Sequence, residues 1–129
     1  GKPELAAKKL QTRLQLSPGN HPLTMSYAHA LQQSQQSHLA EEVLIDQSRI
    51  KPSDPGLWYL LAEVQGLSGN IIGLHQSRAE YFLLVGNLDA AQRQLVYALK
   101  LVGDDFTVSA QINERIGQII DMRTDLDRG

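Results

Sequence analysis

The chain has 129 residues and a formal net charge of −2, with 42% hydrophobic and 20% charged residues. This length predicts one domain. The slight negative charge argues against a nucleic-acid binder, which normally presents a basic face. The absence of cysteine excludes disulfides and thiolate metal sites. With few aromatic and consecutive β-branched residues, and no apolar run long enough to span a membrane, the chain is predicted to be all-α.

Three residue types recur after 34 residues in the first half of the chain. A proline closes each helical pattern, and a small alanine and a larger leucine precede it at fixed distances. The recurring pairs are Ala6 and Ala40, Leu10 and Leu44, and Pro18 and Pro52. A period of 34 residues is that of the tetratricopeptide repeat, in which each repeat is a pair of antiparallel helices.

The first helix, predicted at residues 3–16, corresponds to the second helix of such a repeat. We therefore expect residues 1–129 to form a single tetratricopeptide-like domain whose first repeat is incomplete, cut from a longer protein. On this interpretation Leu5, Leu10 and Leu14 face the helix that follows.

The next two repeats have clear helix starts. Asn20 and Asp54 are predicted N-caps, and each is followed by a proline in the first helical turn. The polar run at residues 32–37 is predicted to be a helix end and its turn, because helical apolar spacing resumes directly after it. Trp58 occupies the first signature position of a repeat, so we expect it in the core.

The register of the repeats slips by half a period in the middle of the chain. Ala91 lies 51 residues after Ala40, which is one and a half periods. Residues 78–99 are typical of two helices folded back on each other around a Gly-Asn pair. The helix at 71–85 must therefore pack against helices on both flanks, and it carries apolar residues on nearly all sides.

A break after Val102 precedes a last helix with one apolar stripe and otherwise polar faces, as suits a helix that closes a stack. Together the patterns predict an all-α, right-handed tetratricopeptide solenoid of about seven antiparallel helices. Breaks are expected near residues 18–20, 35–37, 52–54, 68–70, 86–87 and 103–105.

No pattern in the sequence points to catalysis, a cofactor or a metal. His38 and Glu42 have a spacing that can chelate a metal, but no third ligand is near in sequence. The repeat register favours protein or peptide partners, and it places four residues on the face that would line a binding groove. These residues are Met25, His29, Tyr59 and Glu63. Each of them fits equally well as an exposed residue without a function.

Acidic residues outnumber basic ones in the middle of the chain. Residues 53–90 contain four carboxylates and one arginine. Ordinary solvated faces account for such a distribution, and a face used by a partner is the alternative. If the middle of the chain does bind a partner, its charge favours a basic or polar segment.

The run of residues 74–95, followed by residues 110–117, resembles the C-terminal tetratricopeptide domain of BepA-like bacterial periplasmic zinc metalloproteases. The most specific parts are His75-Gln-Ser-Arg-Ala-Glu-Tyr81 and the pair Arg115-Ile116. In that family a catalytic domain with a His-Glu-x-x-His motif lies upstream. This chain lacks the motif, so neither zinc nor proteolysis is assigned to any of its residues.

The resemblance implies a periplasmic location and a non-catalytic accessory domain. Such a domain docks substrates or partners during assembly and quality control of outer-membrane proteins, and β-barrel assembly components are the implied partners. The alternative is a structural or regulatory domain that packs against and gates the missing catalytic domain.

Overall fold

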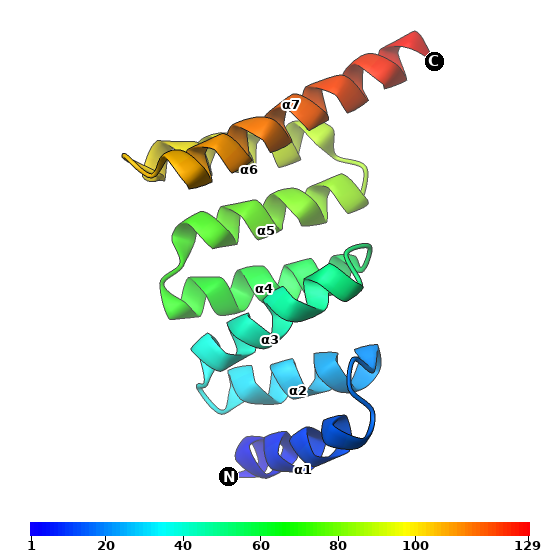
Figure 1. Ribbon diagram of the computed structural model, residues 1–129, viewed down its shortest axis with the longest axis vertical. Helices are drawn as coiled ribbons and strands as arrows, with labels where there is room; N and C mark the ends of the chain where they lie inside the picture. Colours follow the sequence, from blue (N-terminus) through cyan, green and yellow to red (C-terminus); the bar gives the residue numbers. More distant parts are fainter.

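The computed structural model describes all 129 residues and consists of seven α-helices without a strand (Figure 1). Every predicted break lies between two of these helices. The helices are α1 (Lys2–Leu16), α2 (His21–Gln33), α3 (Ser37–Ile50), α4 (Pro55–Ser68), α5 (Ile71–Leu84), α6 (Leu88–Leu101) and α7 (Phe106–Arg128). None of them is both long enough and apolar enough to cross a membrane.

Short polar side chains set the helix starts. The side chains of Asn20 and Asp54 accept hydrogen bonds from the backbone N–H groups of Leu23 and Gly56, as their sequence positions predicted. Asparagine or aspartate caps α5, α6 and α7 in the same way. Gly86 follows α5 with a φ of +82°, a left-handed conformation that only glycine adopts without strain.

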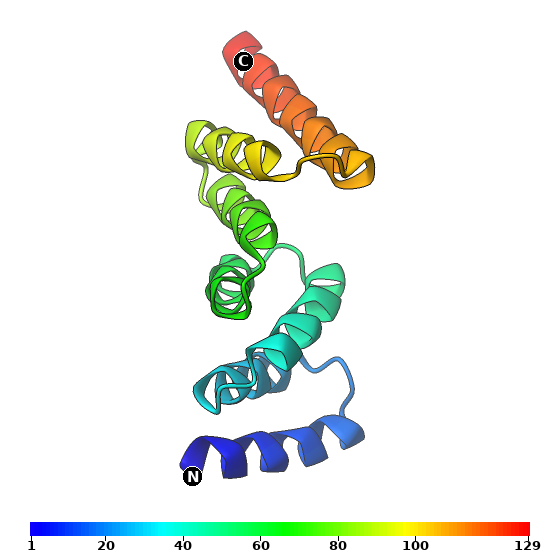
Figure 2. The ribbon, with the colours of Figure 1, turned by 90° about the vertical axis from the view of Figure 1, so that its left-hand side faces the viewer.

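The helices are stacked across the long axis of the molecule, and the chain ends lie at opposite ends of the stack (Figure 1). Each helix packs against its neighbours in sequence, and α2 also contacts α4. In the view turned by 90°, α3 and α7 lie to one side of α4, α5 and α6 (Figure 2). Helix α5 packs against both α4 and α6, which confirms the prediction that it is flanked on two sides.

The buried apolar side chains form two separate clusters. The first, which we call the N-terminal core, joins α1 to α4 and includes the fully buried Ala40, Leu44 and Leu57. The second, the C-terminal core, joins α5 to α7 and includes Ala91 and Leu95. The division between the two cores falls between α4 and α5, where the repeat register slips.

Polar contacts hold α4 to α5 at this division. The hydroxyl of Ser77 on α5 donates a buried hydrogen bond of 2.6 Å to Oε1 of Gln65 on α4. Glu41 of α3 accepts hydrogen bonds from Ser68 and Asn70 at the turn between the two helices. The two halves of the molecule are therefore joined by oriented hydrogen bonds as well as by apolar packing.

One sequence-based assignment of a buried residue is wrong, and a second is confirmed only in part. Leu5 is 54% exposed, and only Leu10 and Leu14 of the three leucines in α1 pack against the N-terminal core. Trp58 is only partly buried, because its ring lies at the edge of the N-terminal core and its Nε1–H donates to the backbone oxygen of Pro52 at 2.8 Å.

Helix α7 runs to Arg128 and so includes the charged residues from Asp121 onward. Two arginines connect α7 to earlier helices. Arg115 donates two hydrogen bonds to Glu80 of α5, at 2.9 and 2.7 Å, and these bonds raise the pKa of Arg115. Arg123 donates to Asp89 and Gln92 of α6. These contacts lie on the partly polar side of α7, where apolar periodicity gives no signal.

We predict that Gly73→Ala destabilises the protein by about 1–3 kcal/mol, because an added methyl group overpacks the contact between α4 and α5. A Cβ atom on Gly73 would lie 2.5 Å from Nδ2 of Asn70 and 2.6 Å from Nε2 of Gln65. Gly117→Ala is the matched control, since a Cβ atom there meets nothing within 4 Å. It should stabilise the protein by roughly 0.5–1 kcal/mol. Urea unfolding of both variants tests this, and equal effects would contradict the packing described here.

Ala91→Leu should cost on the order of 1–3 kcal/mol, because Ala91 is fully buried in the C-terminal core. Ala110→Leu, at an exposed position of α7, is the control and should change the unfolding free energy by less than about 0.5 kcal/mol. Thermal and denaturant unfolding measure both changes. A loss of stability in the control alone would show that the helix faces are wrongly assigned.

Candidate functional site

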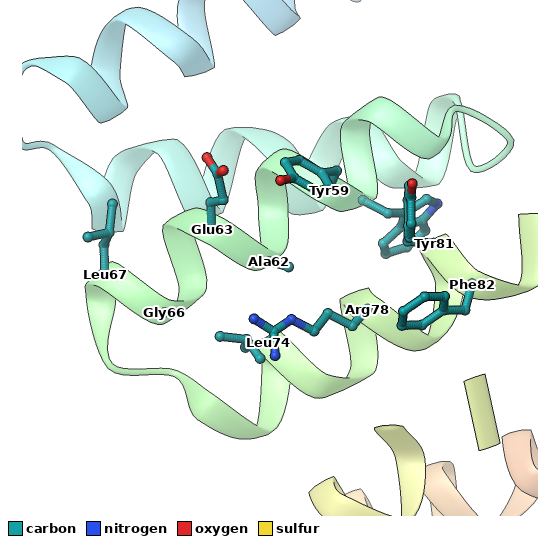
Figure 3. A pocket seen from close by; sticks show the side chains of 10 residues that line it. Tyr59, Ala62, Glu63, Gly66, Leu67, Leu74, Arg78, Tyr81 and Phe82 are labelled. Atoms are coloured by element: carbon teal, nitrogen blue, oxygen red, sulfur yellow. The ribbon is translucent and has the colours of Figure 1, made fainter. Parts of the chain in front are cut away.

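A groove of about 460 Å³ lies between α4 and α5 (Figure 3). It crosses the division between the two cores, because α4 belongs to the N-terminal core and α5 to the C-terminal core. Most of its lining is apolar. The lining residues are Trp58, Tyr59, Ala62, Glu63, Gly66 and Leu67 of α4, and Leu74, Arg78, Tyr81 and Phe82 of α5.

Small residues on α4 keep the floor of the groove open. Ala62 and Gly66 are one helical turn apart and therefore lie on the same face. Gly66 lies inside the helix without a positive φ, so no turn requires a glycine there. A Cβ atom on Gly66 would approach Cδ1 of Leu74 to 3.0 Å. The glycine therefore serves the close approach of α5.

Aromatic rings form one end of the groove. Tyr59 and Tyr81 meet edge to face across α4 and α5, with ring centroids 5.8 Å apart. Tyr81 makes a second edge-to-face contact with Phe82, at 5.6 Å. Tyr59 nevertheless remains 58% exposed. Aromatic pairs of this geometry are stabilising, and exposed tyrosines offer a large contact area at low entropic cost.

The groove contains one carboxylate and one guanidinium, which do not pair with each other. Glu63 accepts a hydrogen bond of 3.0 Å from Nε2 of Gln32 on α2. Arg78 is exposed and takes part in none of the hydrogen bonds or ion pairs of the protein. In Figure 3 the Arg78 side chain extends between α4 and α5, whereas Glu63 points away from it.

The four predicted groove residues do not meet in one site. Tyr59 and Glu63 both line the groove between α4 and α5. Met25 and His29 lie on α2 and are not part of its lining: Met25 packs against the N-terminal core, and His29 is exposed. The groove is therefore formed by two consecutive helices rather than by the first helices of consecutive repeats.

Sequence reasoning did not select the α5 side of the groove. Leu74, Arg78 and Tyr81 line it because α5 packs directly against α4. The unexplained glycine inside α4 was the available signal. Gly66 lies two residues before the end of α4 at Ser68, close to the break expected at residues 68–70.

A second polar cluster ties α2 and α3 to the start of α4. The amide of Gln47 on α3 lies 3.0 Å from Nδ1 of His21 on α2, and Nε2 of His21 lies 2.7 Å from the carboxylate of Asp54. No group of three or more histidine, aspartate or glutamate side chains is placed to hold a metal ion.

Comparisons with protein-family models and with curated proteins find no match to this chain.

We predict that Asp54 makes stability depend on acid pH. The hydrogen bond from His21 is the main cause that holds the pKa of the Asp54 carboxyl below its ordinary value, and the N–H of Gly56 adds to it while burial opposes it. The ionised carboxylate therefore stabilises the fold above about pH 4, and this contribution is lost as the pH falls from there through the lowered pKa.

Asp54→Asn should flatten the fall in unfolding free energy below about pH 4, because asparagine still caps the helix but does not titrate. The measurement is urea unfolding between about pH 2 and pH 6. Asp104→Asn, at an exposed position in the turn before α7, is the control and should retain the slope of the unsubstituted protein. Identical slopes in all three proteins would show that Asp54 does not carry this dependence.

Proposed function

We propose that this chain is a non-catalytic protein-interaction domain that docks a segment of a partner protein in the groove between α4 and α5. The observation that carries the proposal is the groove itself: an apolar floor, an exposed aromatic end and an unpaired cation within about 460 Å³. Binding sites for small ligands and side chains commonly have this size, with few polar groups among apolar ones.

The lining favours binding over chemistry. It contains no serine, threonine, cysteine, histidine or aspartate, and its only carboxylate already accepts a hydrogen bond from Gln32. No serine, threonine or cysteine therefore lies beside a histidine base in the groove, which is a common arrangement for covalent catalysis. Apolar and aromatic surfaces at the centre of a groove are instead typical of protein interfaces.

For the architecture we propose a right-handed tetratricopeptide solenoid. The 34-residue offset in the sequence supports this, as do the fully buried Ala40 and the contact of α2 with α4, which is the contact between first helices of adjacent repeats. Stacked helix pairs of this kind expose elongated surfaces that bind segments of other proteins.

For the cellular role we propose an accessory domain of a periplasmic metalloprotease that takes part in outer-membrane protein assembly and quality control. The support is the resemblance of residues 74–95 and 110–117 to that family. Leu74, Arg78, Tyr81 and Phe82, which form the α5 side of the groove, all belong to the resembling run. Components of β-barrel assembly are the proposed partners.

A second candidate function is packing against the catalytic domain of such a protease. Exposed apolar residues away from the groove favour it, since Phe106 and Leu126 of α7 are 84% and 69% exposed. Mixing the chain with a separately expressed protease domain tests this. Binding that Phe106→Ser weakens and Tyr59→Ala leaves unchanged would favour packing through α7 over docking in the groove.

Peptides selected from a random displayed library against the full chain test the proposed groove. Tyr59→Ala should weaken their binding about tenfold, because it removes an exposed aromatic contact at the groove. Tyr97→Ala is the matched control: Tyr97 is 44% exposed, lies edge to face against His75, and is outside the groove. Its affinity for the same peptides should be unchanged.

The binding constants are measured by calorimetry, and unfolding midpoints verify that both variants are folded. Failure to select any peptide, or an equal response of the two tyrosine variants, would exclude the groove as the docking site.

A further inference from the structure

The groove contains one charged side chain without a hydrogen-bond partner, Arg78, and one with a partner, Glu63, which accepts from Gln32. Each carboxylate in residues 53–90 has a partner. Asp54 binds His21, Glu63 binds Gln32, Glu80 binds Arg115 and Asp89 binds Arg123. Arg78, the only basic residue of the same stretch, has none. The middle of the chain is acidic in composition, yet its unpartnered charge in the groove is positive.

Two other arginines bind carboxylates on another helix, and Arg78 has no such carboxylate partner. Arg115 binds both carboxylate oxygens of Glu80, and Arg123 binds Asp89. A guanidinium presents a planar set of donors that match a carboxylate, which makes such pairs stronger than neutral hydrogen bonds. Arg78 offers the same donors to whatever enters the groove.

The apolar part of the groove lies beside these donors. Leu74 precedes Arg78 by one helical turn and Phe82 follows it by one turn, so the three residues lie along one face of α5. Opposite them, Ala62 and Gly66 leave the floor without large side chains. A ligand that reaches Arg78 therefore also contacts apolar surface on both sides of it.

We propose that the groove selects protein segments in which an aspartate or glutamate lies next to a large apolar side chain. The ligand carboxylate binds the guanidinium of Arg78, and its apolar neighbour packs over Leu74 and Phe82. This inference rests on the proposed docking function and specifies the partner chemistry for that site. It differs from the sequence-based preference for a basic partner, because Asp54, Glu80 and Asp89 bind side chains of other helices and the guanidinium of Arg78 is the group in the groove without a partner.

The test uses the full chain and peptides selected from a random displayed library. The selected peptides should be enriched in acidic residues adjacent to leucine, phenylalanine or tryptophan. Arg78→Gln should lower the affinity for the best peptide about threefold to tenfold, as expected for an exposed to half-exposed ion pair. Added salt should weaken peptide binding by the unsubstituted protein more than binding by this variant, because salt screens the charge pair.

A charge exchange makes the test specific. Arg78→Glu should bind the selected acidic peptide poorly, and replacement of the peptide's acidic residue by lysine should restore binding to this variant. Arg93→Gln is the control, since it removes the same charge from α6 outside the groove, and it should bind like the unsubstituted protein. Circular dichroism and unfolding midpoints verify the fold of each variant.

The outcomes separate this inference from the proposed function. Peptides that depend on Tyr59 but show no acidic preference and no response to Arg78→Gln would overturn the inference and leave the groove as a docking site. Basic peptides selected in their place would overturn it in the same way. If no peptide binds the groove at all, the docking function fails and the inference fails with it.

Discussion

The close contact between α4 and α5 is the constraint on which the rest of this structure depends. The N-terminal and C-terminal cores are separate apolar clusters, so the two halves of the stack are joined at this helix pair and by the hydrogen bond from Asn70 to Glu41 of α3. Its buried hydrogen bond between Ser77 and Gln65 has a defined direction, which apolar packing lacks. A side chain at position 73 would collide with the side-chain amides of Gln65 on α4 and Asn70 at the start of α5. Together these contacts determine how one half is placed on the other.

The same contact produces the groove. Two helices that approach each other through small residues leave a hollow where their larger side chains diverge. Here Ala62 and Gly66 line this hollow together with Tyr59, Tyr81 and Leu74. The residues that join the two cores and the residues that line the groove are therefore neighbours. A ligand in the groove would contact both halves of the molecule, and it would bind the stacked arrangement in preference to the unfolded chain.

The number of charged residues in a stretch of this sequence does not show which of their side chains are paired in the structure. Composition gives residues 53–90 an excess of carboxylates, but three of them meet His21, Arg115 and Arg123 from other helices. Those partners are 33 to 35 residues away in sequence. Since the stacking brings them together, no window of the sequence reports which charged groups have a partner. In the groove Glu63 accepts a hydrogen bond from Gln32, whereas Arg78 has no partner.

The sequence by itself determined the helices, because their signals are local. Caps such as Asn20 and Asp54, breakers such as Gly86, and apolar spacing along each helix predicted seven helices and every break between them. The half-period slip also predicted that α5 packs on two flanks. The site was predicted in part: Tyr59 and Glu63 line the groove, whereas Met25 and His29 lie elsewhere.

Only the tertiary structure decided which faces meet and what remains uncovered. Leu5 and Trp58 have apolar side chains at helical spacing, but their burial depends on whether another helix lies over them. The unpaired Arg78 is likewise a property of the stack. Helix formation depends on neighbours within a few residues of the chain. Burial and pairing depend on residues that the stacking brings together from different helices, and the sequence pattern does not specify which residues those are.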